Sequence, residues 1–222
     1  MGNSISKHDS AKKYMECYAK ELLESLMPER YSHLSIKEKP DIQMSDDYGI
    51  EVTWAMYDNQ GRGNGLLTVT AGKRFDDLDA GIVRNIEKSN LRMITGEDGC
   101  ICGYTDKKPK NRVTNKELYC EYKKKIEKVR GYPTETIDLF IFPALAHIDG
   151  WLGEKIITDF FATITEEVDC PFNNIIVYEE PTLYMFDYKN SKLLITKGTE
   201  QQIKKCKEAA DNYSGYSKRY KQ

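Results

Sequence analysis

Apolar and polar residues alternate along two short runs near residue 50, and a polar segment separates them. The first run begins Asp-Ile-Gln at 41–43, and the second reads Ile-Glu-Val-Thr-Trp-Ala at 50–55. The segment between them, Ser-Asp-Asp-Tyr-Gly at 45–49, is typical of a tight turn, so the pattern predicts a β-hairpin. Side chains alternate along a strand, which puts Glu51 and Thr53 on one face and the apolar side chains of the second run on the other.

A helical period of apolar residues recurs elsewhere in the chain and predicts five helices. We expect them at about 10–27, 76–93, 114–130, 153–167 and 200–211. The third begins with a capping box, Thr114 and Glu117. Its inner stripe is predicted to be Leu118, Tyr122, Ile126 and Val129. In the first helix, Glu21 falls at the border of the apolar face.

The run from Ile137 to Phe142 is almost continuously apolar, as in a central strand that is covered on both faces. Its one charge, Asp138, is interpreted as lying at the start of the strand rather than in a site. Other strands are predicted at 66–70, 174–178, 183–187 and 192–196. Strands and helices therefore alternate around the hairpin, which favours an α/β fold with a mixed β-sheet flanked by helices.

The remaining segments are predicted to be loops within a single α/β domain that spans 1–222. The stretch at 58–65 contains Gly-x-Gly-x-Gly and is interpreted as a plain glycine loop, with a phosphate cradle as the weaker alternative. An insertion or long loop is expected at 95–113. A flexible basic tail is expected at 212–222, where three tyrosines lie among basic residues.

Charge is distributed unevenly, although the formal net charge of the 222 residues is only −2. Residues 104–130 hold ten Lys or Arg against four Asp or Glu, and residues 188–222 hold nine against three. Such runs are usually solvated surface. Basic segments beside an acidic site would also suit a metal-dependent phosphodiesterase, because basic groups bind a phosphate backbone and carboxylates bind the metal.

Composition predicts a cytoplasmic protein with reduced thiols. No apolar run approaches the roughly 18 residues of a membrane span, and no signal peptide is expected. The six cysteines include one close pair, Cys100 and Cys102, which is a poor zinc signature without a second pair. The first six residues, Met-Gly-Asn-Ser-Ile-Ser, fit the loose pattern for N-myristoylation, which we do not expect to be used.

The predicted hairpin also contains the candidate metal ligands, since Asp41 and Glu51 are expected on its two neighbouring strands. Two carboxylates held beside an apolar face suit a hard divalent cation such as Mg²⁺. The residues Pro40-Asp41, a turn and then Glu51-Val52-Thr53 resemble the motif of the PD-(D/E)XK nuclease superfamily. In that superfamily, a Pro-Asp on one strand precedes an acid-x-Lys on the next. The resemblance covers about 17 residues, and the order of the predicted elements is similar to a restriction-endonuclease-like core.

The resemblance implies that Asp41 and Glu51 bind Mg²⁺ or Mn²⁺ together with a further acid from the first helix. Glu21 is a better candidate for this acid than Glu24, which points further toward solvent. Thr53 stands where the superfamily has its lysine. That lysine positions the attacking water and offsets charge, so a cation from another element has to replace it. We rank Lys73 first for this role, ahead of Arg84 and Lys88, which lie on the predicted helix at 76–93.

Three functions remain open on the sequence alone. The first is a metal-dependent, nuclease-like phosphodiesterase that acts on nucleic acid. The second is a non-catalytic relative, a binding or regulatory module that keeps the fold without turnover, because fold does not fix function. The third, a phosphate-binding protein that uses the glycine loop, has little support. Hydrolysis by a Ser-His-Asp triad has little support, because the chain has only three histidines and no Gly-x-Ser-x-Gly motif.

Overall fold

A computed structural model describes residues 7–55, 58–107, 114–143 and 150–215. The chain forms two compact units, one made of 1–55 and 114–222 and the other of 56–113. The one-domain assignment for 1–222 stays a prediction, since compact units need not fold independently. The N-terminal hexapeptide, the 144–149 segment that includes His147, and most of the basic tail lie outside the described residues.

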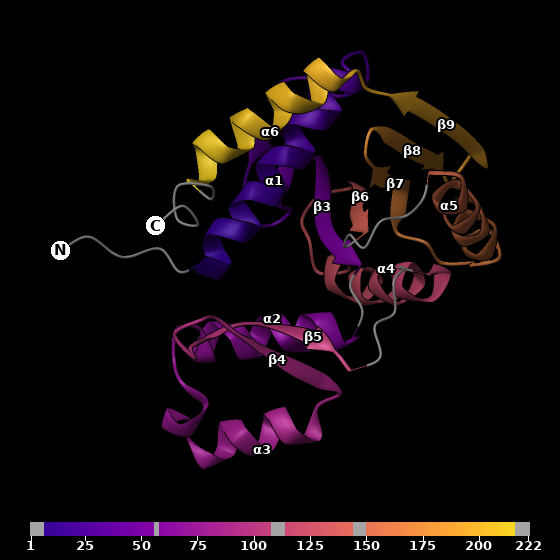
Figure 1. The fold of residues 1–222 in the computed structure, drawn as a ribbon. Helices are drawn as coiled ribbons and strands as arrows, with labels where there is room; N and C mark the ends of the chain where they lie inside the picture. The colour runs from indigo at the N-terminus through magenta and orange to yellow at the C-terminus, as the bar shows by residue number, and fades with distance from the viewer. Residues whose placement is uncertain (1–6, 56–57, 108–113, 144–149, 216–222) are drawn as a thin grey trace. The chain divides into compact units, whose positions relative to one another are not determined.

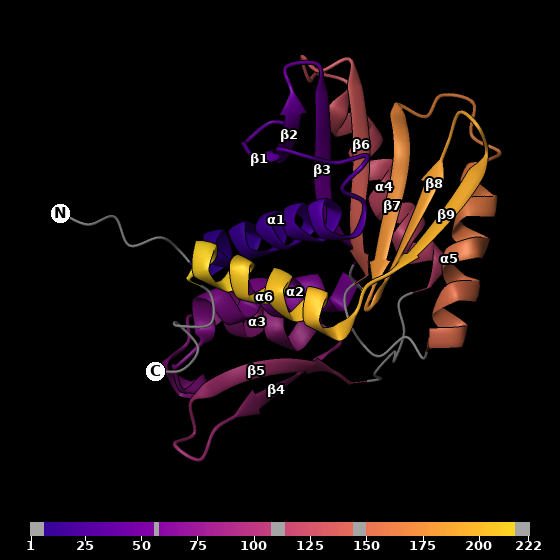
Figure 2. The ribbon, with the colours of Figure 1, turned by 90° about the horizontal axis from the view of Figure 1, so that it is seen from above.

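The first unit is α/β, with a mixed seven-stranded sheet in the order β1-β2-β3-β6-β7-β8-β9 (Figure 2). Its strands are β1 (Ser35–Ile36), β2 (Ile42–Ser45), β3 (Tyr48–Ala55), β6 (Thr136–Pro143), β7 (Phe172–Glu179), β8 (Thr182–Asp187) and β9 (Lys192–Lys197). The strands β3, β6 and β7 are parallel to one another, and the other neighbouring pairs are antiparallel. The predicted β2–β3 hairpin is confirmed, and the strands predicted at 183–187 and 192–196 pair with each other as β8 and β9.

Helices cover both faces of this sheet, as Figure 1 shows. They are α1 (Lys7–Leu26), α4 (Asn115–Val129), α5 (Gly150–Ile164) and α6 (Glu200–Ser214). The helices α1 and α6 pack side by side on one face, and α4 and α5 cover the other. In the part of the chain that the structure describes, no helix is long and apolar enough to cross a membrane.

The strand β6 lies at the centre of the sheet and is buried on both sides, as the apolar run predicts. Phe140 and Phe142 join the core under α1 and α6, because alternate residues of the strand face that layer. Asp138 is the third residue of β6, near the start of the strand as the sequence predicts. It is fully buried within β6, where two tyrosine hydroxyls and Asn174 donate hydrogen bonds to its carboxylate.

The helix α4 matches its prediction closely, since Thr114 and Glu117 form the capping box and the four residues of the inner stripe are buried. The lysines in the second half of α4 lie off that stripe, and none of them is buried. Among them, Lys125 and Lys128 lie three residues apart and share one side of the helix. This side faces β3, which α4 contacts.

The second unit contains α2 (Asp58–Thr70), a short 3₁₀ turn (Phe75–Asp77), α3 (Ala80–Lys88), β4 (Leu91–Thr95) and β5 (Ile101–Asp106). The strands β4 and β5 form an antiparallel pair. Three expectations are wrong here. The glycine loop and the strand at 66–70 together form the helix α2. The helix expected at 76–93 ends at Lys88, and β4 follows it. Part of the loop expected at 95–113 is the strand β5.

Tertiary packing explains the helix at 58–70 despite its glycines. A Cβ atom on Gly63 would lie 3.3 Å from the Cβ of Tyr104, so the missing side chain allows α2 to lie close against β5. Leu66 is buried with Ile86 and Leu91. The helix α3 ends at Lys88, where the backbone N–H of Ser89 donates to the carbonyl oxygen of Ile86. The residues that follow form β4, which pairs with β5 instead of continuing the helix.

Candidate functional site

The predicted site lies where β3 extends beyond the end of β2. Ile42 pairs with Ile50, and Asp41 directly precedes β2. The backbone N–H of Val52 therefore has no partner on β2, and it donates to Oδ2 of Asp41 at 2.9 Å. This hydrogen bond fixes Asp41 at the open edge of β3, next to Glu51.

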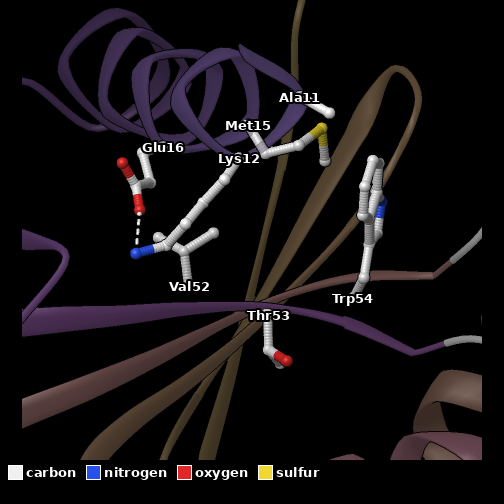
Figure 3. Close-up of a pocket in the computed structure, with 7 residues that line it drawn as sticks. All are labelled: Ala11, Lys12, Met15, Glu16, Val52, Thr53 and Trp54. Atoms are coloured by element: carbon white, nitrogen blue, oxygen red, sulfur yellow. Dashed lines mark ion pairs between the residues drawn. The ribbon is translucent and has the colours of Figure 1, made fainter. Parts of the chain in front are cut away.

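The carboxylates of Asp41 and Glu51 are both inaccessible, with 1% and 0% of the residue exposed. Burial, followed by the negative charge of Glu51, raises the pKa of Asp41. The two side chains are therefore close enough to repel each other, as the hairpin pattern predicts. The alternation along β3 also holds. Val52 and Trp54 point toward α1, and Thr53 points to the opposite side (Figure 3).

Three donors from α4 and the residues after it surround the carboxylate of Glu51. The Nζ of Lys125 lies 2.5 Å from Oε1 of Glu51 and 3.2 Å from the carbonyl oxygen of Val52. Lys128 contacts the same carboxylate oxygen, and the hydroxyl of Tyr132 donates to the other at 2.8 Å. Burial alone would raise the pKa of Glu51. The charge of Lys125 and the hydrogen bonds from all three residues hold that pKa below its usual value.

Asp41 has a different cationic neighbour, which comes from α1. The Nζ of Lys12 lies 3.4 Å from Oδ1 of Asp41 and 3.0 Å from Oε1 of Glu16. Glu16 is itself buried, and burial raises its pKa, which the charge of Asp41 raises further. Lys12 and Glu16 also line a pocket of about 180 Å³ between α1 and β3, together with Val52, Thr53 and Trp54 (Figure 3).

The other predicted site residues have different surroundings. Glu21 forms an ion pair with Lys20 at 2.9 Å, and the acid of α1 that approaches Asp41 is Glu16 instead. Thr53 lies on the face covered by α4, where its hydroxyl is 3.3 Å from Oε2 of Glu121. Lys73 belongs to the second unit, as do Arg84 and Lys88, so its catalytic role stays a prediction.

Sequence reasoning missed Glu16, Lys12, Lys125, Lys128 and Tyr132. For the first two, the i to i+4 spacing of Lys12 and Glu16 on one helix was an available signal. No comparable signal links the lysines of α4 to Glu51, because more than seventy residues separate Lys125 from it. Only the packing of α4 on β3 brings them together.

A metal ion fits these residues only in part. In the described ranges, no three His, Cys, Asp or Glu side chains are grouped closely enough to hold one. Two carboxylates, Asp41 and Glu16, nevertheless share a single cationic neighbour, and carboxylate oxygens are the ligands that Mg²⁺ and Mn²⁺ prefer. Glu51 is the less available ligand, because its oxygens already accept from two lysines and a tyrosine.

Comparison of the chain with models of known protein families, with curated proteins and with solved structures finds no match.

Proposed function

We propose that this chain is a divalent-metal-dependent phosphodiesterase of the PD-(D/E)XK type that cleaves nucleic acid. The observation that carries the proposal is the contact of Glu51 with Lys125 and Lys128. The motif has Thr53 in place of its lysine, and an active site of this type needs a positive charge from elsewhere. Two lysines of α4 supply that charge beside the Asp41–Glu51 pair.

The order of elements gives further support. The helix α1 precedes the β1–β2–β3 meander, α4 leads into β6, and α5 leads into β7. A restriction-endonuclease-like core is expected to have a helix, a meander, a helix and a further strand in this order. The positions of the motif residues also support the proposal, since Asp41 directly precedes β2 and Glu51 lies within β3.

The proposed roles follow from the surroundings of each side chain. Asp41 and Glu16 would hold Mg²⁺ or Mn²⁺, and Glu51 would complete the acidic site. The bound ion would lower the pKa of a water molecule and offset charge on the phosphate. Lys125 would orient the attacking water, since it is only 15% exposed and is held by both Glu51 and a backbone carbonyl. Lys128, which is 42% exposed, would meet the phosphate backbone of the substrate.

One observation favours the non-catalytic alternative. Glu51 is completely buried, and its carboxylate has three donors, as a structural ion-pair network would have. A chain that keeps the fold without turnover would retain such a network for stability. In that case the protein would bind nucleic acid or another partner through its surface and would need no metal ion.

Cleavage assays with Asp41→Asn test the two functions against each other. Asparagine keeps an oxygen for the N–H of Val52 but removes the charge that a metal ion needs. Single- and double-stranded DNA and RNA would be incubated with Mg²⁺ or Mn²⁺. We expect cleavage by the wild-type protein and its loss in Asp41→Asn, with Asp46→Asn in the exposed turn as the matched control. Cleavage that survives Asp41→Asn would rule out this site. The absence of cleavage by the wild type would favour the non-catalytic module.

A further inference from the structure

Two carboxylate oxygens beside the pocket under α1 have unusual surroundings. Oε1 of Glu16 and Oδ1 of Asp41 are buried, and neither has a hydrogen-bond partner in the described part of the chain. Glu16 is 5% exposed and Asp41 is 1% exposed, so water does not solvate these side chains freely. Buried carboxylate oxygens without hydrogen-bond donors need a positive charge beside them, so a cation has to occupy this position.

A cation from the protein itself already lies there. The Nζ of Lys12 is 3.0 Å from Oε1 of Glu16 and 3.4 Å from Oδ1 of Asp41, the two oxygens that lack hydrogen-bond partners. Figure 3 shows the lysine extending from α1 toward β3, with its ion pair to Glu16 marked. A single ammonium group therefore neutralises both carboxylates, on which the proposed metal site depends.

The side chain of Lys12 is 53% exposed, in contrast to the buried side chains of the two acids. A lysine is a compact charge on a flexible stem of four carbons. Holding such a side chain in one conformation costs entropy, whereas the two buried carboxylates need a positive charge beside them. Lys12 can therefore move from the carboxylates into solvent by rotation of its own side chain when another cation takes its place, without movement of α1 or β3.

We propose that Glu16 and Asp41 form a cation site that the Lys12 ammonium group occupies when no metal ion is bound. Lys12 then competes with a divalent metal ion for the two carboxylates. This inference rests on the proposed function and extends it, since it makes metal loading dependent on the position of one lysine. The apparent affinity for metal equals the intrinsic affinity multiplied by the fraction of molecules in which Lys12 is away from the site. At low metal concentration, Lys12 keeps the site closed to the ion and stabilises the two buried acids.

Titration with Mn²⁺, followed by the electron paramagnetic resonance signal of the free ion, tests the competition without an activity assay. We expect Lys12→Met in the full chain to lower the apparent Kd for Mn²⁺ by about tenfold, as for a resident lysine that occupies the site in nine molecules of ten. The matched control is Lys13→Met, because Lys13 is the next residue of α1 and is exposed. Glu16→Gln and Asp41→Asn should each weaken Mn²⁺ binding.

A second measurement uses the wild-type protein and does not depend on the folding of Lys12→Met. The NMR signal of the Lys12 Cε group is followed during titration with Mg²⁺, which is diamagnetic. We expect this signal to move toward the position of a free lysine as Mg²⁺ binds, while the signal of Lys13 stays unchanged. A chemical shift of Lys12 Cε that does not change at a saturating concentration of Mg²⁺ would contradict the inference.

The outcomes separate this inference from the proposed function. If Mn²⁺ binding depends on Asp41 but has the same Kd in the wild type, Lys12→Met and Lys13→Met, then Lys12 does not compete and the proposed function survives. If Lys12→Met binds Mn²⁺ more tightly and yet no variant cleaves nucleic acid, the competition is real and the nuclease proposal fails. If Mn²⁺ binds neither the wild type nor Lys12→Met, both proposals fail.

Discussion

The side chain of Asp41 accepts a hydrogen bond from the backbone N–H of Val52 at 2.9 Å. Val52 lies between Glu51 and Thr53, so this single contact joins the two halves of the Pro-Asp and Glu-x-Thr motif. It also uses one carboxylate oxygen and leaves the other directed at Lys12. The position of the predicted site therefore depends on the backbone of β3 as much as on the acidic side chains.

Gly49→Ala should destabilise the hairpin that carries the site. A Cβ atom at Gly49 would lie 2.0 Å from Cγ of Pro40, closer than any real contact, so the strands would have to separate. We expect the free energy of unfolding to fall by about 2 to 3 kcal/mol. Urea denaturation of Gly49→Ala and Gly131→Ala measures this, since a Cβ at Gly131 meets nothing within 4 Å. Equal midpoints in the two variants would contradict the proposed clash.

Asp138→Asn should be strongly destabilising, although the substitution changes few atoms. The hydroxyls of Tyr31 and Tyr48 donate to one carboxylate oxygen at 2.5 and 2.7 Å, and Asn174 donates to the other through its backbone N–H and its side chain. An asparagine amide would present a donor to groups that also donate. We expect a loss of about 2 to 4 kcal/mol, against about 1 kcal/mol for Tyr48→Phe, which removes one donor. Thermal and urea unfolding would compare the variants, and similar losses in both would show that the carboxylate is not critical.

Glu179→Gln should change how stability depends on pH. Burial, with a smaller contribution from the charge of Glu154, raises the pKa of Glu179 to about 7. The folded state therefore keeps this proton at pH values where the unfolded state, with an ordinary pKa of 4.5, has lost it. The stabilisation is complete below that lower value and is lost as the pH rises through 7.

We therefore expect the free energy of unfolding of the wild type to fall relative to Glu179→Gln between about pH 4.5 and 7.5. The difference should be on the order of 1 to 2 kcal/mol, less than the full pKa shift implies, because of solvent screening. Urea denaturation at a series of pH values measures it. Glu180→Gln is the control, since Glu180 is exposed and pairs with Lys207. Parallel pH profiles for the wild type and Glu179→Gln would contradict the assignment.

Lys125→Met should reduce cleavage more than it reduces stability, if the proposed function is correct. Methionine keeps much of the apolar stem, and Lys128 and Tyr132 still donate to Glu51. We expect the cleavage rate to fall by about 100-fold through loss of the charge beside the reacting phosphate. Lys124→Met is the control on the same helix, where Lys124 is 65% exposed and pairs with Glu121. An unchanged rate in Lys125→Met, with metal-dependent cleavage intact, would return the role to Lys128 or to Lys73.

The sequence by itself determined the elements whose signal is local. The alternation of side chains predicts the β2–β3 hairpin, because alternate residues of a strand face opposite sides of the sheet. The unbroken apolar run predicts the central position of β6, because a strand that is covered on both faces buries every side chain. The capping box at Thr114 likewise marks the start of α4. In the second unit local reasoning failed. Close packing of α2 against β5 outweighs the low helix propensity of its glycines.

Only the tertiary structure decided which side chains meet at the predicted site. The sequence identifies Asp41 and Glu51, but it contains no rule that pairs Glu51 with Lys125, which is 74 residues away. It also selects Glu21 and does not single out Glu16, since the angle of a residue around a helix does not reveal how that helix lies on the sheet. Ion pairs of this kind form after the layers have packed. They depend on the positions of whole helices, and the periodicity of a sequence predicts the buried face of a helix but not where that helix lies on the sheet.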